Sequence, residues 1–203
     1  MIKRKLFLIA TVAGLSALVC FVFYFVFLQS GINSGLDQIT AKAFAFYDQS
    51  QVNLASAPLR LKIPEINLDA AVEYAGITSG GVVGVPKGPI NVAWFDLSAI
   101  PGTPGVAVID GHAGWHGGIH AVFDDLPKLK VGDKMYVTDK KGTVTAFVVR
   151  AMKNYPENGD ASDLFTSTDG GAHLNLVTCA GVWNPQLKTH SERLVVFADK
   201  VAS

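Results

Sequence analysis

Apolar and polar residues alternate along short segments from Pro58 onward, and this alternation is the main structural signal of the chain. In the first segment, Leu59, Leu61 and Ile63 are separated by basic residues, as in a half-buried strand. Similar or largely apolar runs, bounded by glycine, proline and other turn residues, predict further strands. These runs cover residues 71–75, 105–110, 134–138, 143–152, 174–179 and 194–201.

Seven or eight short strands, with only a helical turn near residues 123–129, predict an all-β fold that is either a barrel or a sandwich. A segment of about 145 residues can bury its own hydrophobic core without disulfide bonds. We therefore assign one folded domain to residues 58–203.

A different pattern occupies the N-terminal part of the chain. Residues 6–28 contain no charged side chain, and a helix of this length is roughly 34 Å long, enough to cross a hydrocarbon core of about 30 Å. The run is too long for the apolar region of a cleaved signal peptide, and no Ala-x-Ala-like site follows it. Residues 1–5 carry three basic residues, which keep this end in the cytoplasm. We expect a single-pass anchor in the cell membrane, with the domain outside.

The segment between anchor and domain, residues 29–57, has its own composition. Gly31, Ser34 and Gly35 would end the anchor helix, and apolar residues then recur at near-helical spacing over residues 36–47. We predict a stalk or linker with one short helix. This helix could pack on the domain or lie at the bilayer surface.

Charge is balanced over the whole chain, with 17 basic and 17 acidic residues. Residues 58–203 carry 13 of the basic and 15 of the acidic residues. A nucleic-acid partner would need a basic patch, which a near-neutral domain does not offer. We therefore expect no nucleic-acid partner.

The histidines raise the question of a metal site. His112, His116 and His120 are four residues apart, a spacing that would suit metal ligands on a helix. Three glycines between them make a helix improbable, so we expect no metal and no cofactor. His173 and His190 are expected to be solvated or to lie in loops.

One cysteine stands out as candidate chemistry. Residues 173–179 predict a strand that ends at Cys179 and is followed by a turn at Gly181. The other cysteine, Cys20, lies in the apolar run far away, so Cys179 has no plausible disulfide partner. An unpaired cysteine at a strand end is either inert packing or a nucleophile, and a nucleophile needs a base and a cation nearby.

Two residues can supply them. His112 follows Gly111 at the end of a predicted strand, and Arg193 begins the last predicted strand. An imidazole beside a thiol of pKa about 8.5 can help to form the thiolate or can protonate a leaving amine. A guanidinium can stabilise an oxyanion. Asp110 shares a strand with His112 but differs in reach, so we assign it no role.

These motifs resemble those of the sortase family. Residues 176–179, Leu-Val-Thr-Cys, resemble the Leu-x-Thr-Cys core of sortases, although Asn175 stands where many sortases have threonine. The other similar segments are Gly111-His112, residues 193–196, residues 61–70 and residues 123–133. The resemblance extends over residues 58–198 in the same order, and an anchor with a cytoplasmic N-terminus is common among sortases.

The resemblance implies an eight-stranded β-barrel transpeptidase. Sortases cleave a Leu-Pro-x-Thr-Gly-like sorting signal between its last two residues, form a thioacyl enzyme on the cysteine and transfer the acyl group to an amine. Carried onto this chain, Cys179 is the nucleophile and His112 the general acid and base. Arg193 stabilises the oxyanion and holds the substrate, and Thr178 helps to line the substrate site. The loop at residues 181–185 is most similar to class F, with classes D and E as alternatives.

The implied partners are secreted proteins with a C-terminal sorting signal, an amine acceptor of the cell envelope or a pilin, and membrane lipid through the anchor. Two other functions stay open. The same site could be a hydrolase with water as acceptor, or the domain could be a membrane-anchored binding module with an inactive site. The L,D-transpeptidases place histidine and cysteine close together in sequence, whereas His112 and Cys179 are 67 residues apart, which counts against that family.

Overall fold

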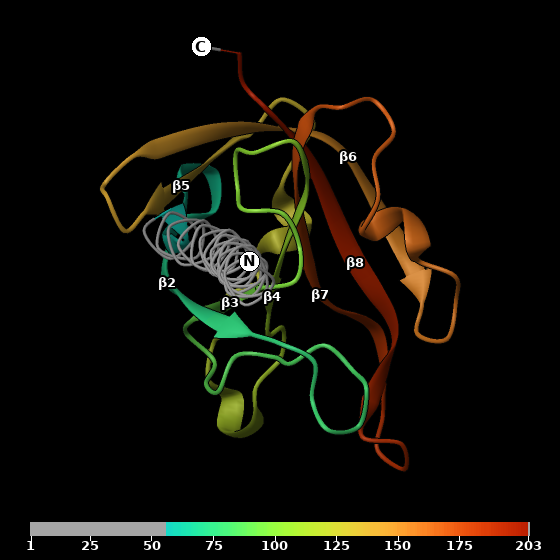
Figure 1. Cartoon of the computed structure of the whole chain (residues 1–203). Coiled ribbons are helices and arrows are strands. Elements are labelled where there is room, and N and C mark those ends of the chain that lie inside the picture. The colour runs from blue at the N-terminus through green and yellow to red at the C-terminus, as the bar shows by residue number, and fades with distance from the viewer. Residues whose placement is uncertain (1–55, 203) are drawn as a thin grey trace, which may run out of the picture. The chain divides into compact units, whose positions relative to one another are not determined.

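The computed structural model describes residues 56–202, so the predicted tail, the predicted anchor and all but two residues of the predicted stalk lie outside the described residues. Eight strands close into a barrel (Figure 1). The strands are β1 (Pro58–Ile63), β2 (Leu68–Ala75), β3 (Val92–Phe95), β4 (Gly105–Gly111), β5 (Lys134–Asp139), β6 (Val144–Pro156), β7 (Ala172–Asn184) and β8 (Thr189–Lys200). The prediction of an all-β barrel is therefore confirmed.

The helical content of residues 56–202 is limited to short 3-10 turns and a single helical residue at Ser56. The turns are η1 (Pro64–Ile66), η2 (His116–Gly118), η3 (Leu126–Lys128) and η4 (Ser162–Leu164). Within this part of the chain no helix is long and apolar enough to cross a membrane.

The strands follow each other around the barrel in the order β1-β2-β3-β4-β7-β8-β6-β5. Two neighbouring pairs, β2–β3 and β4–β7, are parallel, and the others are antiparallel. The parallel β4–β7 pair brings the segment before His112 beside the segment before Cys179. The long β7–β8 hairpin, orange to red in Figure 1, then brings the segment around Arg193 to the other side of β7.

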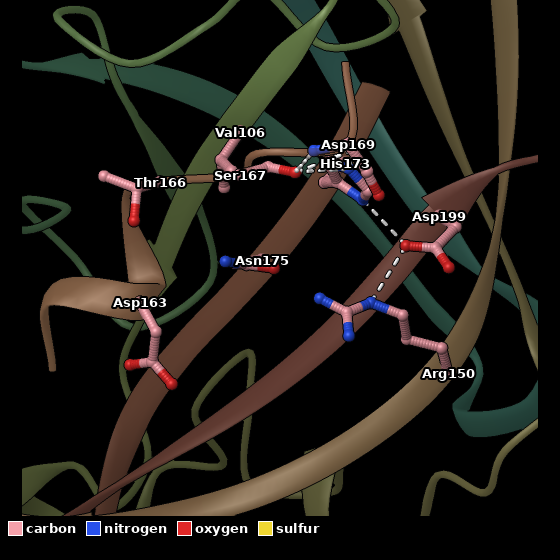
Figure 2. Close-up of a pocket in the computed structure, with 9 residues that line it drawn as sticks. All are labelled: Val106, Arg150, Asp163, Thr166, Ser167, Asp169, His173, Asn175 and Asp199. Atoms are coloured by element: carbon pink, nitrogen blue, oxygen red, sulfur yellow. Dashed lines mark hydrogen bonds and ion pairs between the residues drawn. The ribbon is translucent and has the colours of Figure 1, made fainter. Parts of the chain in front are cut away.

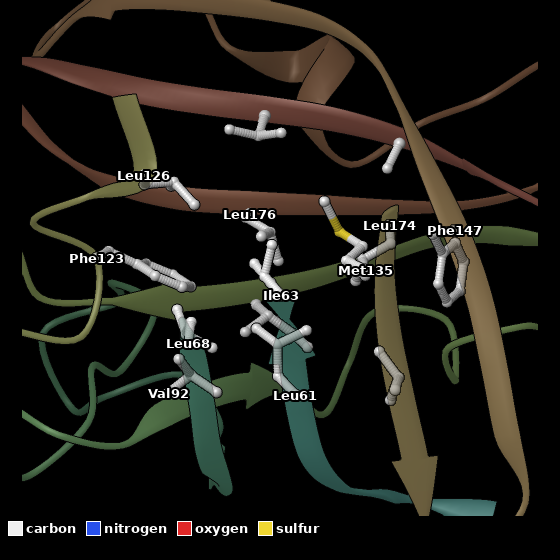
Figure 3. Packing of buried hydrophobic residues seen from close by; sticks show 14 of the residues in the cluster. Leu61, Ile63, Leu68, Val92, Phe123, Leu126, Met135, Phe147, Leu174 and Leu176 are labelled. Carbon is white, nitrogen blue, oxygen red and sulfur yellow. The ribbon is translucent and has the colours of Figure 1, made fainter. Parts of the chain in front are cut away.

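The main core fills the barrel. Because side chains of a strand point to opposite faces in turn, alternate residues such as Leu61 and Ile63 on β1, or Leu174 and Leu176 on β7, all point inward. They pack around Phe123 and other fully buried side chains (Figure 3). The alternation that predicts strands in the sequence is thus the alternation that fills the barrel.

A second apolar cluster, which we call the outer cluster, lies on the other face of the same strands. The segment between β6 and β7, residues 157–171, which we call the β6–β7 segment, contributes Leu164 to it from η4. The buried members are Val106, Val108, Tyr155, Leu164, Val195 and Phe197. The strands β4, β7 and β8 are therefore packed on both faces. The predicted nucleophile, Cys179, lies on the outer face of β7, two residues after Val177, which packs against the outer cluster.

Two details of the sequence prediction are wrong. The strand β3 was not predicted, because Val92, Ala93 and Trp94 are all buried and show no alternation. The chain does not turn at Gly181: β7 continues to Asn184, and the pairing with β8 shifts register between Ala180 and Trp183. Gly181 has a φ of 75°, and a Cβ there would collide with the hydroxyl of Ser191, so the glycine permits a bulge within a longer hairpin.

Candidate active site

Three neighbouring strands bring the predicted site residues into one row. Cys179 on β7 is the direct partner of Arg193 on β8. On the other side of β7, Asp110 on β4 is paired with Val177, so continuing that parallel register by two residues places His112 opposite Cys179. The structure thus brings Cys179 on β7, Arg193 on β8 and His112 just beyond the end of β4 to adjacent positions, and we call these three residues the active-site row.

His112 stands just beyond the end of β4. Its Nε2 atom lies 2.9 Å from the carbonyl oxygen of Pro86, and its ring contacts that of Trp115, with 4.7 Å between centroids. The preceding residue must be small, because a Cβ at Gly111 would overlap the ring of Phe123. The tight packing of Phe123 on Gly111 therefore holds the end of β4 in place, directly before His112.

Cys179 is half-buried, and it forms no disulfide within residues 56–202. Burial raises the pKa of its thiol above the ordinary value; the positive charge of Arg193 lowers it, and the carboxylates of Asp110 and Glu157 raise it further. The net effect is a raised pKa, so the thiol is protonated at neutral pH. A nucleophile in this setting needs a base to accept its proton.

Arg193 is held mainly by its own hairpin. Its Nη1 atom donates to the backbone carbonyls of His190 at 3.0 Å and Glu192 at 2.9 Å, and its Nη2 atom donates to the hydroxyl of Thr189 at 3.0 Å. Nη2 also lies 3.5 Å from the carboxylate of Glu157. These contacts leave a fixed positive charge beside the thiol, although the guanidinium is directed at the hairpin rather than at the sulfur.

Thr178 takes a different position from the one expected of a residue that lines a substrate site. Its side chain is 1% exposed and lies on the inward face of β7, where its hydroxyl donates to the carbonyl of Gly111 at 2.7 Å. This bond ties the residue before His112 to the residue before Cys179. A direct role of Thr178 in lining the substrate site stays a prediction.

Asp110 belongs to the same neighbourhood, although the sequence analysis gave it no role. It lies on the same face of β4 as His112, and burial raises the pKa of its carboxyl to about 7, while the positive charge of Arg193 limits the rise. The signal in the sequence was its position two residues before His112 on one strand face. Its nearness to Cys179 and Arg193 becomes apparent only when β7 and β8 are placed beside β4.

A polar cavity lies farther along the outer face, under the β6–β7 segment (Figure 2). His173 lies here, and the expectation that it is solvated is wrong: the residue is 6% exposed. Its Nδ1 atom lies 2.8 Å from the carboxylate of Asp199 and its Nε2 atom 2.9 Å from that of Asp169. Asn175 donates to the carbonyl of Leu164 at 2.8 Å. These bonds attach the β6–β7 segment to the barrel.

The remaining histidines are spread over separate contacts. His116 lies beside Trp115, His120 lies 3.7 to 3.8 Å from the carboxylates of Asp125 and Asp124, and His190 lies on β8 rather than in a loop. Within the described residues, no group of three or more histidine, cysteine, aspartate or glutamate side chains is arranged to hold a metal ion.

Comparisons with known proteins agree with this geometry. A family model described as the sortase domain matches residues 61–201. No curated protein gives a match.

Among solved structures, the chain resembles sortase C1 from Streptococcus agalactiae, with 23% identity, a TM-score of 0.56, and coverage of 71% of this chain and 67% of that one. It also resembles sortase C from Clostridium perfringens SM101, with 22% identity, a TM-score of 0.52 and coverage of 71% and 69%. A pilus-related sortase C of Group B Streptococcus gives 21% identity, a TM-score of 0.56 and coverage of 73% and 69%. These structures share the fold, and the family model covers most of the chain. The chain therefore belongs to the sortase family of cysteine transpeptidases.

Proposed function

We propose that this sortase cleaves a Leu-Pro-x-Thr-Gly-like sorting signal through a thioacyl intermediate on Cys179 and joins the released protein to an amine of the cell envelope. The observation that carries the proposal is the active-site row. A thiol on β7, a guanidinium on β8 and an imidazole just beyond the end of β4 occupy adjacent positions in a chain whose family performs this chemistry.

In the first half of the proposed reaction, the sulfur of Cys179 attacks the carbonyl carbon of the threonine in the signal. His112 accepts the thiol proton, and the positive charge of Arg193 stabilises the oxyanion of the tetrahedral intermediate. The bond between threonine and glycine then breaks, and His112 gives its proton to the leaving amine. The product is a thioester between the threonine and Cys179.

In the second half, an acceptor amine attacks the thioester carbonyl. His112 takes a proton from the attacking nitrogen, the C–S bond breaks, and the Cys179 thiolate that leaves recovers this proton from His112, which restores the free thiol. An amide bond to the acceptor replaces the original peptide bond. Because bond energy is conserved through the thioester, the enzyme needs no cofactor for this transfer.

In the substrate-free structure, two side chains of the active-site row are held by contacts that the proposed reaction requires them to leave. The guanidinium of Arg193 must leave part of its hairpin contacts to reach an oxyanion near the sulfur. The contact between His112 and the Pro86 carbonyl must also yield, because Nε2 is the atom that this carbonyl holds. We propose that docking of the signal peptide at the active-site row supplies both changes.

The partners and location follow from the same proposal. The substrates would be secreted proteins with a C-terminal sorting signal, and the acceptor would be an envelope amine or a pilin. One structural neighbour is described as pilus-related, which supports keeping a pilin among the acceptors. Residues 6–28 would anchor the enzyme in the cell membrane with its N-terminus in the cytoplasm, and the subclass would be F, with D or E as alternatives.

The test is a cleavage assay of the full chain against a library of sorting-signal peptides, with and without an added amine. We expect cleavage after threonine, and an amide product that appears only when the amine is present. Release of the free acid in both conditions would instead show a hydrolase. Absence of cleavage across the library, together with peptide binding, would show an inactive binding module.

A further inference from the structure

Asp110 is an acidic group at the base of the active-site row that the proposed reaction does not use. It lies on the outer face of β4, two residues before His112, and its direct partners are Ala93 on β3 and Val177 on β7. Cys179 is the next residue along the same face of β7. Asp110 is therefore diagonal to Cys179 on the neighbouring strand, and it precedes His112 by two residues along its own chain segment.

The surroundings of this carboxyl are mostly apolar. Val108 precedes it on the same face of β4 and belongs to the outer cluster, and Val177 packs against that cluster. Asp110 keeps some contact with solvent, while protein atoms occupy most of its environment. Within residues 56–202 its carboxylate has no hydrogen-bond or ion-pair partner. A largely buried carboxyl without a protein partner is costly to ionise, so its presence here requires an explanation.

The ionisable groups around Asp110 come from four places. His112 lies on its own strand, Cys179 on β7 and Arg193 on β8, and Glu157 lies at the start of the β6–β7 segment, where it pairs with Arg193. The partner on β3 is Ala93, which has no ionisable group. Arg193 thus stands between two carboxylates, of which only Glu157 lies within ion-pair distance.

We propose that Asp110 is a positioning residue of the active site that acts through Cys179 and Arg193: its carboxylate keeps the thiol protonated in the substrate-free enzyme and competes with Glu157 for the guanidinium. This proposal rests on the proposed role of Cys179 as the nucleophile.

The electrostatic consequence has a definite sign. A negative carboxylate disfavours a second negative charge on the neighbouring sulfur, and it draws the positive charge of Arg193 toward the base of the row. The carboxyl of Asp110 has a pKa of about 7, so its charge changes near neutral pH. Titration of Asp110 and ionisation of Cys179 are therefore coupled, and loss of the carboxylate lets the thiolate form at lower pH.

The test compares the full chain with its Asp110→Asn variant, which keeps the size of the side chain and removes the charge. The rate of alkylation by iodoacetamide is measured from about pH 5 to about pH 10, and modification is read on the peptide that contains Cys179, so that Cys20 does not interfere. We expect the titration midpoint of Cys179 to fall by half a unit or more, which is a rise of about threefold in alkylation rate at about pH 8, where Asp110 is mostly ionised and the thiol is still mostly protonated.

Two variants control this test. Glu65→Gln makes the same change of charge at an exposed residue of η1, and it should leave the midpoint unchanged. Asp110→Glu keeps a carboxylate and should leave the midpoint closer to the parent value than Asp110→Asn does. Thermal unfolding of each variant shows whether a change in rate reflects loss of structure.

An Asp110→Asn midpoint equal to that of the parent and of Glu65→Gln would overturn the proposal, whether or not the chain cleaves peptides. A lowered midpoint in a chain that cleaves no sorting signal would support the coupling and would contradict the proposed function instead. The assay needs no substrate, so the two failures are distinguishable.

Discussion

Two histidines on opposite ends of the β4–β7 strand pair are held in very different ways. His173, at the start of β7, is buried, and both of its ring nitrogens face carboxylates, those of Asp199 and Asp169 (Figure 2). The imidazole of His112, just beyond the end of β4, has one hydrogen-bond partner within the described residues, the carbonyl of Pro86, and its ring contacts that of Trp115. Thus the histidine at one end of the strand pair has both ring nitrogens bound, and the histidine at the other end has only one bound.

We infer from this difference that His173 serves the stability of the fold and His112 serves the chemistry. Two carboxylates at once favour the charged form of the His173 imidazole and leave neither of its ring nitrogens for a substrate. His173 therefore fastens the β6–β7 segment to β7 and β8. The imidazole of His112 is held by a single hydrogen bond, to the Pro86 carbonyl, so once this bond yields the ring can exchange a proton with a thiol or an amine. Five predictions break or sharpen this comparison, from the largest expected effect to the smallest.

Replacing the thiol should remove the chemistry and leave the fold. In Cys179→Ala, we expect peptide cleavage to fall to background, because no other described residue can form the thioester. Cys179 is half-buried and small, so the free energy of unfolding should change by only about 1 kcal/mol. Parallel cleavage and denaturant-unfolding measurements check both parts. Cleavage at the parent rate would show that the nucleophile is another residue.

Replacing the loosely held histidine should also act on rate rather than stability. We expect His112→Gln to lose roughly 100- to 10,000-fold in kcat/KM, the usual contribution of a general acid and base, with little change in unfolding. The matched control is His173→Gln, which makes the same substitution on the same sheet face. If both variants lose rate equally per folded molecule, the functional distinction between the histidines is wrong.

Replacing the fully bound histidine should act on stability. In His173→Gln, the carboxylates of Asp169 and Asp199 lose their shared hydrogen-bond partner, and we expect a destabilisation of about 1–3 kcal/mol. Turnover per folded molecule should stay within a few-fold of the parent. Urea unfolding followed by circular dichroism measures the first effect, and the cleavage assay measures the second. An unchanged unfolding midpoint would contradict the role given to His173.

The same cluster predicts how stability depends on pH. Although burial alone lowers the pKa of His173, hydrogen bonds and charges from Asp169 and Asp199 outweigh it and raise the pKa above 6.5. A raised pKa gives stability that is complete below the unfolded value of 6.5 and is lost as pH rises through the folded value.

On the acid side, hydrogen bonds from His173, Gly171 and Ser167 lower the pKa of Asp169 below its ordinary value of 3.8. Its contribution is therefore present above that value and is lost as pH falls through the lower folded value. We expect the free energy of unfolding to be highest between about pH 4 and about pH 6.5. Unfolding curves across pH check this, and His173→Gln should flatten the decline on the alkaline side. An equal decline in the variant would assign it to other groups.

The smallest effect concerns the link between the two strands of the site. In Thr178→Val, the hydroxyl that bonds the Gly111 carbonyl is replaced by a methyl group of similar size, which removes this buried hydrogen bond. We expect a loss of about 1–2 kcal/mol in stability and a modest loss of rate. Thr178→Ser keeps the hydroxyl and should retain more of both. If valine matches the parent in both measurements, the bond to Gly111 does not position His112.

Much of the barrel was predictable because most of its strands bury one face, so apolar and polar residues alternate along them with a period of two. β3 escaped because Val92, Ala93 and Trp94 are buried on both faces, so the period is absent. The extension of β7 beyond Gly181 depends on pairing with β8, where a bulge takes up the glycine. Local sequence patterns do not contain that pairing.

The site was predictable to a different extent. Cys179, His112 and Arg193 were proposed as site residues from residue types and family motifs, and the strand register brings them together in one row. His173 was wrongly expected to be solvated, and the surroundings of Asp110 could not be read from the local sequence, for one physical reason. Their environments are made by other strands: His173 meets Asp199, 26 residues away, and Asp110 meets the charge of Arg193 across β7.

The central claim is that Cys179 forms a thioester with a sorting signal, and the mass of a trapped intermediate tests it most directly. The full chain is mixed with the best-cleaved peptide, quenched in acid and digested, and the fragment that contains Cys179 is weighed. We predict an added mass equal to the peptide up to its threonine, which disappears when an amine is supplied before quenching and is absent from Cys179→Ala. Cleavage without any adduct on Cys179, or with the adduct on another residue, would contradict the account.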